Sequence, residues 1–196
     1  MDTFLKVLDP ADTSTGGGSA SAVAGAMAGA LLAMVARLSE ATQEESEVHL
    51  CERIFTQAGQ LSQELLEGSQ EDALAFQGVR RAYQLPRQTD EAKIARQQAV
   101  QEAWLRAASV PLENAGRCLR VVELGGELAG RVNPKVISDY RCALLLAQAG
   151  LLGCLENVYI NLPAINDATL AEQLARQARD LSERLRQTDS LSNEVR

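Results

Sequence analysis

The sequence is poor in the residues that build metal centres and activated nucleophiles. It has a single histidine, His49, and its four cysteines (Cys51, Cys118, Cys142 and Cys154) lie far apart, with no Cys-x-x-Cys pair. Zinc sites need several well-spaced nitrogen or sulfur ligands, and di-iron bundles need Glu-x-x-His motifs that are missing here. We therefore expect no metal, and we interpret the cysteines as reduced core residues of a cytoplasmic protein.

A basic surface is missing as well. The net charge is −7, which argues against non-specific nucleic-acid binding, because such binding needs a basic surface. No segment alternates apolar and polar residues convincingly enough to predict a strand. The 196 residues, 46% of them hydrophobic, suffice for one domain with a real core. We expect a single helical domain over residues 1–187, followed by a polar tail at 188–196.

Charge is absent between Asp12 and Arg37, where the chain is rich in alanine and glycine instead. A helix without charge on any side is buried on all sides, and the spacing of Gly25 and Gly29 favours close helix packing. The stretch is long enough to span a membrane, but such small residues drive insertion weakly. The acidic segment before it also differs from the basic start of a signal peptide. We therefore predict the buried central helix of a bundle, over residues 19–39.

Three glycines, Gly16 to Gly18, precede this helix, and Ser19 can cap it. The glycines form either a flexible turn or an anion site built from free N–H groups at the helix N-terminus. The pattern is not Gly-x-x-x-x-Gly-Lys-Ser/Thr and no strand precedes it, so neither a P-loop nor a dinucleotide-binding turn fits. From the residues alone, both interpretations remain open.

Helical spacing continues along the rest of the chain, with Gly68 as a predicted stop before Ser69 and Pro111 as a predicted break or restart. Asp139 and Asn157 fall on one face of a helix but about 27 Å apart, too far for one compact pocket. Apart from the central helix, we expect helices at residues 1–8, 48–66, 69–85, 90–108, 112–128, 133–160 and 167–185.

Five segments in order carry a family resemblance over roughly residues 4–170. They are Gly-Gly-Gly-Ser at 16–19, Asp-Ala-Leu-Ala-Phe at 72–76 running to Leu-Pro-Arg at 85–87, the alanine stripe at 96–112, Asn-Pro-Lys at 133–135 running to Asp139, and Asn-Val-Tyr-Ile-Asn-Leu at 157–162. Together they resemble the cyclodeaminase/cyclohydrolase family that acts on one-carbon folates, the deaminase half of formiminotransferase-cyclodeaminase. The chain departs from the family pattern at Thr15 (usually Pro), Val132 (usually Gly) and Arg87 (usually Lys), and residues 41–47 are acidic where the family is often Lys-rich.

The resemblance implies an all-α bundle of about six main helices that forms a homodimer. It implies one of two activities: cyclodeaminase, which converts formiminotetrahydrofolate to 5,10-methenyltetrahydrofolate and ammonia, or methenyltetrahydrofolate cyclohydrolase. The substrate is a folate, possibly polyglutamylated, with no cofactor beyond it and no membrane or nucleic-acid partner. A non-catalytic folate-binding or helical scaffold protein of the same fold is the alternative.

The resemblance also suggests the site residues. Asp72 and Asp139 lie in its motifs and are the expected proton-transfer groups, because a buried carboxylate stabilises cationic nitrogen and moves protons. Considered alone, either acid could also be structural, and Asp72 fits a helix first turn, where it favours the dipole. We expect the remaining residues to converge around the folate, with the loop N–H groups or the arginine facing its anionic tail. They are Gly16, Gly17, Gly18, Ser19, Arg87 and Asn133.

Overall fold

The computed structural model describes residues 2–40 and 45–194, and over these ranges the chain is helical with no strand. The all-α prediction is therefore confirmed. The helices are α1 (Asp2–Val7), α2 (Gly17–Glu40), α3 (Glu45–Tyr83), α4 (Asp90–Leu128), α5 (Ile137–Asn161) and α6 (Ala168–Glu194), with 3₁₀ turns η1 (Pro134–Val136) and η2 (Leu162–Ala164).

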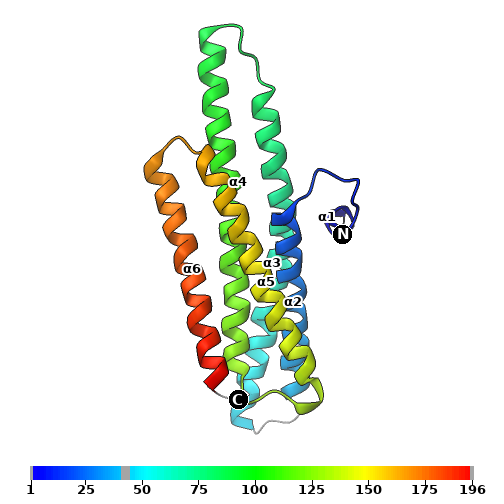
Figure 1. The fold of residues 1–196 in the computed structure, drawn as a ribbon. Coiled ribbons are helices and arrows are strands. Elements are labelled where there is room, and N and C mark those ends of the chain that lie inside the picture. The colour runs from blue at the N-terminus through cyan, green and yellow to red at the C-terminus, as the bar shows by residue number, and fades with distance from the viewer. Residues whose placement is uncertain (1, 41–44, 195–196) are drawn as a thin grey trace.

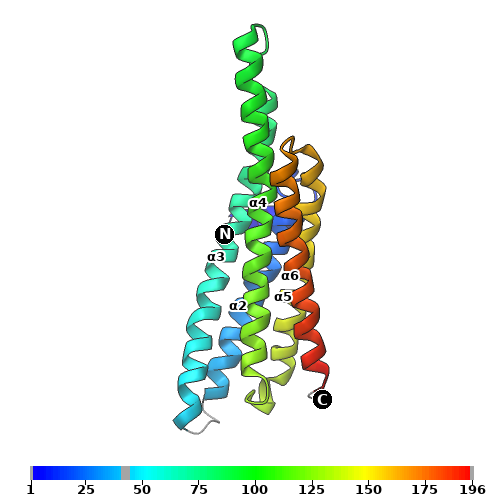
Figure 2. The same ribbon diagram turned by 90° about the vertical axis from the view of Figure 1, so that its left-hand side faces the viewer.

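Helices α2 to α5 form an elongated bundle, and α6 packs along its side against α4 (Figures 1 and 2). The upper halves of α3 and α4 project beyond the other helices as a long hairpin (Figure 1). The short helix α1 and the loop after it lie beside the N-terminal end of α2. This end of α2 is where the loop, α3, α4 and α5 all come close.

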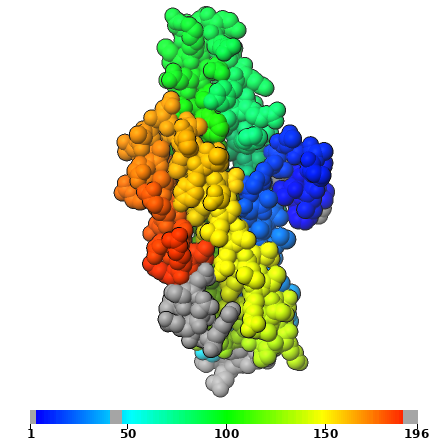
Figure 3. Space-filling model, viewed as in Figure 1, coloured from blue at the N-terminus to red at the C-terminus, as the bar shows by residue number. Residues whose placement is uncertain are grey.

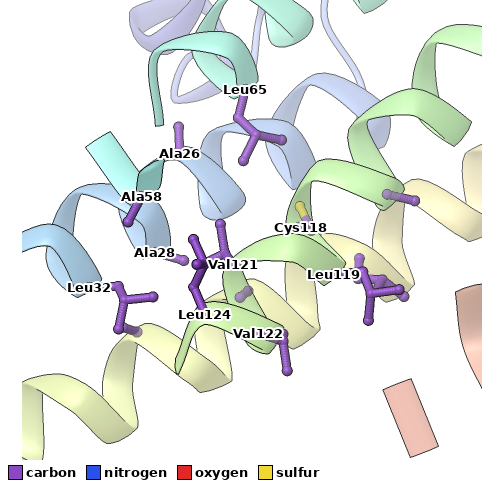
Figure 4. Close-up of a cluster of buried hydrophobic side chains, with 14 of the residues drawn as sticks. Ala26, Ala28, Leu32, Ala58, Leu65, Cys118, Leu119, Val121, Val122 and Leu124 are labelled. Carbon is purple, nitrogen blue, oxygen red and sulfur yellow. The ribbon is translucent and has the colours of Figure 1, made fainter. Parts of the chain in front are cut away.

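Helix α2 packs closely on its neighbours because its residues are small. A Cβ atom added to Gly29 would lie 2.9 Å from the carbonyl oxygen of Ala58, so a side chain there would collide with the α3 backbone. Larger apolar side chains of α3 and α4, among them Leu65, Leu119 and Leu124, complete the core around this helix (Figure 4). However, Met27, Ala30 and Met34 form an exposed stripe on α2. The prediction that this helix is buried on all sides is therefore wrong, because one face of it remains open to solvent.

Helix α3 runs without interruption through Gly68, which corrects the predicted stop at that residue. A Cβ at Gly68 would collide with the side chain of Asn114 on α4, whose Nδ2 donates to the Gly68 carbonyl at 3.1 Å. The glycine is therefore a point of close helix–helix approach. Ser69 does not cap a new helix, because its hydroxyl donates back to the carbonyl of Leu66.

Helix α4 likewise continues through Pro111, which corrects the predicted break. Proline has no N–H for the carbonyl four residues earlier, so the helix leaves the Ala107 carbonyl without its usual partner. The side chain of Asn161 on α5 donates to that carbonyl at 2.8 Å. A contact from another helix thus repairs the bond that proline removes.

Other local predictions have mixed outcomes. Asp167 accepts from the N–H groups of Thr169 and Leu170 and begins α6, which extends to Glu194, beyond the expected end at Leu185. Three cysteines are buried and all four are free thiols, but Cys142 is exposed and is not a core residue.

Among the described residues, two segments are long and apolar enough to cross a membrane by length and composition, Gly17–Glu40 and Pro134–Ala164. Core helices of soluble proteins pass the same test, and α2 is mostly buried inside the bundle. The second segment, which contains α5, is only 39% buried.

Candidate active site

A cleft of about 610 Å³ lies at the N-terminal end of α2. Its size falls within the range of small-molecule sites, roughly 300 to 1,000 Å³. Four segments contribute its walls: the loop before α2, and helices α3, α4 and α5. The lining residues are Asp12, Thr13, Ser14, Thr15, Gly16, Asp72, Ala73, Phe76, Trp104, Ala107, Asn157, Ile160 and Asn161.

The carboxylate of Asp72 lies directly against the first turn of α2. The buried hydroxyl of Ser19 donates to Asp72 Oδ2 at 2.8 Å, and the Ser19 N–H also donates to this carboxylate. A Cβ atom at Gly18 would collide with the Asp72 carboxylate, so glycine is needed there for the close approach. The Gly-Gly-Gly-Ser segment is thus in contact with the carboxylate of a residue on α3, more than fifty residues away in the sequence.

Burial raises the pKa of the Asp72 carboxyl above its usual value, and the two hydrogen bonds from Ser19 offset part of this effect. One interpretation is that Asp72 caps α2 from another helix, where the helix dipole favours negative charge. However, the raised pKa means that keeping Asp72 ionised costs folding free energy. A perturbed acid in a cleft is typical of functional sites, so the geometry favours a chemical role as well.

Asp12 provides a second carboxylate at the cleft. Ser14 donates to its Oδ1 from both the backbone N–H, at 2.6 Å, and the hydroxyl, at 2.5 Å. These hydrogen bonds hold the pKa of Asp12 below its usual range. No lysine, arginine or histidine lines the cleft in the part of the chain that the structure describes. The cleft is therefore anionic and suits a cationic or charge-delocalised ligand.

Aromatic and amide side chains complete the walls. Phe76 is half exposed, and the Trp104 indole donates to the hydroxyl of Tyr83 at 3.3 Å. Asn157 and Asn161 both donate Nδ2 to helix carbonyls, at 2.8 Å each. Neither Oδ1 accepts a hydrogen bond from the described residues, which leaves both oxygens for a ligand. A flat heteroaromatic molecule with N–H donors would fit this combination.

Asn133 lies at the opposite end of the bundle. Its N–H donates to the hydroxyl of Ser39 at 2.9 Å, and its side chain donates to the Leu38 carbonyl at 3.0 Å. Because Ser39 follows Ser19 by twenty residues of helix, about 30 Å separate Asn133 from the cleft. The expected convergence of the glycine loop, Asn133 and Arg87 within one chain is therefore wrong.

Asp139 lies in the first turn of α5, at the same distant end as Asn133. As the spacing indicates, the length of α5 separates it from Asn157 and from the cleft. The structure therefore brings Asp72, and not Asp139, to the Gly16–Ser19 segment.

Arg87 lies at the tip of the α3–α4 hairpin, about three helical turns beyond Asp72. It lines a separate hollow of about 360 Å³ together with Lys93 and Arg96. The Arg96 guanidinium donates to the backbone carbonyl of Tyr83 and lies 5.3 Å from the centroid of the Tyr83 ring. The Tyr83 hydroxyl in turn accepts a hydrogen bond from Trp104, which lines the cleft. A chain of contacts thus connects the anionic cleft to a basic hollow.

Sequence reasoning missed Asp12 and Trp104 as lining residues. It also did not include Asn157 and Asn161 among the expected site residues. Two asparagines four residues apart on a largely apolar helix were a usable signal, because buried amides need partners. Nothing in the pattern around Trp104 distinguishes it from a core residue.

Fold and cleft together define an all-α protein with an anionic ligand site where three helices meet the N-terminus of a fourth. The formiminotransferase-cyclodeaminase family model matches residues 1–180. The methenyltetrahydrofolate cyclohydrolase of Methylorubrum extorquens is 36% identical, with 96% of this chain and 94% of that protein covered. The chain belongs to the formiminotransferase-cyclodeaminase family, as the sequence motifs predicted.

Two further relatives support this assignment to the family. The crystal structure of formiminotetrahydrofolate cyclodeaminase from Thermotoga maritima matches with a TM-score of 0.85 and 25% identity, over 98% of this chain and 92% of that one. The mouse formimidoyltransferase-cyclodeaminase is 28% identical over 87% of this chain, which spans only 32% of the longer mouse protein.

Proposed function

We propose that this protein is an enzyme of folate one-carbon metabolism and that it hydrolyses 5,10-methenyltetrahydrofolate to formyltetrahydrofolate. The observation that carries the proposal is the pair of carboxylates, Asp12 and Asp72, in a cleft lined by no cationic side chain among the described residues. The methenyl bridge is a cation shared by two nitrogens, and such a cleft favours it. The near full-length similarity to a methenyltetrahydrofolate cyclohydrolase supports this choice of reaction.

In the proposed mechanism, Asp72 acts first as a general base. It accepts a proton from a water molecule whose oxygen bonds to the bridge carbon, and the bridge charge is neutralised in a tetrahedral intermediate. One carbon–nitrogen bond then breaks, Asp72 returns its proton to the departing nitrogen, and the hydroxyl releases its proton to solvent as the formyl carbonyl forms. A carboxyl whose pKa is raised by burial is suited to both transfers, because it lies closer to the operating pH.

The cyclodeaminase reaction remains the second candidate. It passes through a tetrahedral carbon beside cationic nitrogen and expels ammonia in place of accepting water, so the same carboxylates would serve it. The structural match to a cyclodeaminase favours this alternative. Neither reaction needs a metal or a redox cofactor. Folate binding without turnover in either reaction would identify the non-catalytic alternative.

For binding, we propose that the pterin lies against Phe76 and Trp104, with Asn157 accepting from its N–H groups. The glutamate tail, including polyglutamylated forms, would extend along the α3–α4 hairpin toward Arg87 and Arg96. Opposite charge supports this direction, because the tail is anionic and the hollow is basic. We also propose a cytoplasmic homodimer, as is implied for this family.

The decisive experiment is a paired assay of the purified protein with methenyl- and formimino-tetrahydrofolate, corrected for the uncatalysed reactions. We expect faster turnover of the methenyl substrate. Faster turnover of the formimino substrate would reverse the assignment, and turnover of neither would overturn the enzyme proposal.

Calorimetry tests the binding site separately. Gly17→Val introduces a Cβ atom that would lie 3.2 Å from Asn157 Nδ2, so it should weaken folate binding, whereas Gly59→Val on an open face of α3 should not. Arg87→Glu should reduce affinity for a polyglutamylated folate more than for the monoglutamate. Equal affinities for all three variants and the wild type would remove this site assignment.

A further inference from the structure

Pro111 lies buried inside α4, where a proline normally destabilises a helix, because it removes a backbone hydrogen bond and crowds the preceding turn. The carbonyl that it frees belongs to Ala107, which lines the cleft. The end of α5, which supplies the donor to this carbonyl, lies at the surface beside the start of α6 and below the projecting hairpin (Figure 3). A helix breaker thus lies one turn from the ligand site, and local rules are typically broken where function requires it.

The bond to the Ala107 carbonyl determines which way the Asn161 amide faces. A carbonyl oxygen only accepts hydrogen bonds, so the amide turns its Nδ2 group toward it, at 2.8 Å. The Oδ1 atom accepts no hydrogen bond from the described residues. Among these residues, no buried side-chain nitrogen or oxygen lacks a hydrogen-bond partner, so this Oδ1 is open to solvent. Because Asn161 lines the cleft, its oxygen is an acceptor available to a ligand there.

Asn157, one turn earlier on α5, is held in the same sense by a different carbonyl. Its Nδ2 donates to the Gly153 carbonyl at 2.8 Å, so its Oδ1 is also left as an acceptor. With the carboxylates of Asp12 and Asp72, the two amides give the cleft four side chains that accept hydrogen bonds. Such a wall selects a ligand edge that carries N–H donors. A reduced pterin has this edge in its 2-amino and N3–H groups.

A separate contact holds the end of α5 in place. Gln101 on α4 donates from Nε2 to the Ala164 carbonyl at 3.2 Å and accepts from the Asn166 N–H at 2.7 Å. These two bonds fasten the turn after Asn161 to α4, whichever group bonds to the carbonyl that the proline frees. What Pro111 controls is therefore the orientation of one amide, and not the position of the helix that carries it.

We propose that Pro111 is a positioning residue for folate binding. It frees the Ala107 carbonyl to hold the Asn161 amide, whose Oδ1 accepts a hydrogen bond from the pterin. With any other residue at position 111, a backbone N–H bonds to that carbonyl within α4 and displaces the amide. The released amide then rotates, and the pterin donor loses a fixed acceptor. The contact with the pterin rests on the proposed function, whereas the orientation of the amide does not.

A crystal structure of ligand-free Pro111→Ala tests the orientation. We expect the new N–H at position 111 to bond to the Ala107 carbonyl and the Asn161 Nδ2 to leave it, with both Gln101 contacts unchanged. Because α4 regains a hydrogen bond and loses a helix breaker, the Tm should not fall. An Asn161 side chain that keeps its bond to the Ala107 carbonyl would overturn the proposal.

A double-mutant cycle tests the contact, with kinetics on the folate substrate that the wild type turns over faster. Asn161→Ala should raise KM about three- to tenfold and leave kcat within about twofold, because it removes a binding contact away from the reacting carbon. Pro111→Ala should raise KM in the same way, although α4 becomes more stable. The double variant should regain the stability lost in Asn161→Ala, because the Ala107 carbonyl has a partner again. Its KM should be no higher than that of Asn161→Ala.

Gly116→Ala is the control for the stability of α4, because nothing lies within 4 Å of a Cβ atom added there. It removes a helix-destabilising glycine and leaves the Ala107 carbonyl bonded to Asn161, so KM should stay at the wild-type value. A wild-type KM in Pro111→Ala, or effects on KM that add up in the double variant, would overturn the proposal. A wild type that turns over neither folate substrate would count against the proposed function instead, and the crystal structure would still decide the orientation of the amide.

Discussion

Replacement of Asp72 by asparagine separates a catalytic carboxylate from a helix cap. The amide keeps the shape of the side chain, and its oxygen still accepts one of the two hydrogen bonds that Ser19 provides. What it loses is the negative charge and the ability to accept a proton. If Asp72 is the general base, kcat should fall by about a hundredfold or more while folate binding persists.

The effect of Asp72→Asn on stability follows from the direction of the pKa shift. Weakening a hydrogen bond to a charged acceptor costs about 1.5 to 3 kcal/mol, but the amide also removes the cost of burying a charge. The folded-state pKa of Asp72 is raised, which means that the cost of burying its charge exceeds the stabilisation from the Ser19 hydrogen bonds. We therefore expect a Tm within a few degrees of wild type at neutral pH, since 1 kcal/mol corresponds to about 2 to 4 °C for a chain of this size.

The pH dependence supplies an independent check. Between its usual value of 3.8 and its raised folded value, Asp72 binds its proton more tightly in the folded state. Wild-type stability relative to Asp72→Asn should therefore increase as the pH falls through the folded pKa toward 3.8, and decrease as the pH rises. Thermal denaturation of both proteins across this range measures the difference.

Asp139→Asn is the matched control, because Asp139 lies at the far end of α5 and should leave kcat within a few fold of wild type. The reasoning fails if Asp72→Asn turns over normally and melts several degrees lower, which is the behaviour of a helix cap. It also fails if the loss of activity appears in Asp139→Asn instead.

Three further changes test the surrounding structure. Gly29→Leu should lower Tm strongly or prevent folding, because its side chain must enter the α3 backbone, and calorimetric melting measures this. Ser19→Ala removes a donor to the Asp72 carboxylate and should raise its pKa, so the acidic limb of the kcat/KM profile should move to higher pH. Asn161→Ala leaves the Ala107 carbonyl unpaired beside Pro111, and urea denaturation should show a loss of about 1 to 3 kcal/mol.

Each of these variants has a control with similar chemistry. Gly59→Leu introduces the same side chain where nothing lies within 4 Å, and should melt near wild type. Ser69→Ala removes a buried hydroxyl that bonds only its own helix, and should leave the pH profile in place. Asn166→Ala, the control for Asn161→Ala, changes an exposed asparagine and should unfold in urea like the wild type. A control that behaves like its test variant would contradict the corresponding explanation.

The sequence was informative where the physical cause is local. The charge-free run between Asp12 and Arg37 predicted the core helix, and Asp167 predicted the start of α6. The ordered motifs predicted the family and brought Asp72 and the Gly16–Ser19 segment into one hypothesis. All of these depend on composition, or on residues close together along the chain.

Tertiary contacts decided the rest. Gly68 and Pro111 carry strong local signals for helix ends, yet both helices continue. Asn114 donates from α4 to the Gly68 carbonyl, and Asn161 donates from α5 to the Ala107 carbonyl that Pro111 leaves without its usual partner. Asp72 and Asp139 look alike as acids in similar motifs, and only the antiparallel packing of α3 and of α5 against α2 places the first at the cleft and the second at the far end. A sequence records which residues can pack, hydrogen-bond or ionise. Which of them come into contact, and which acid is therefore buried away from solvent, is decided by the tertiary structure.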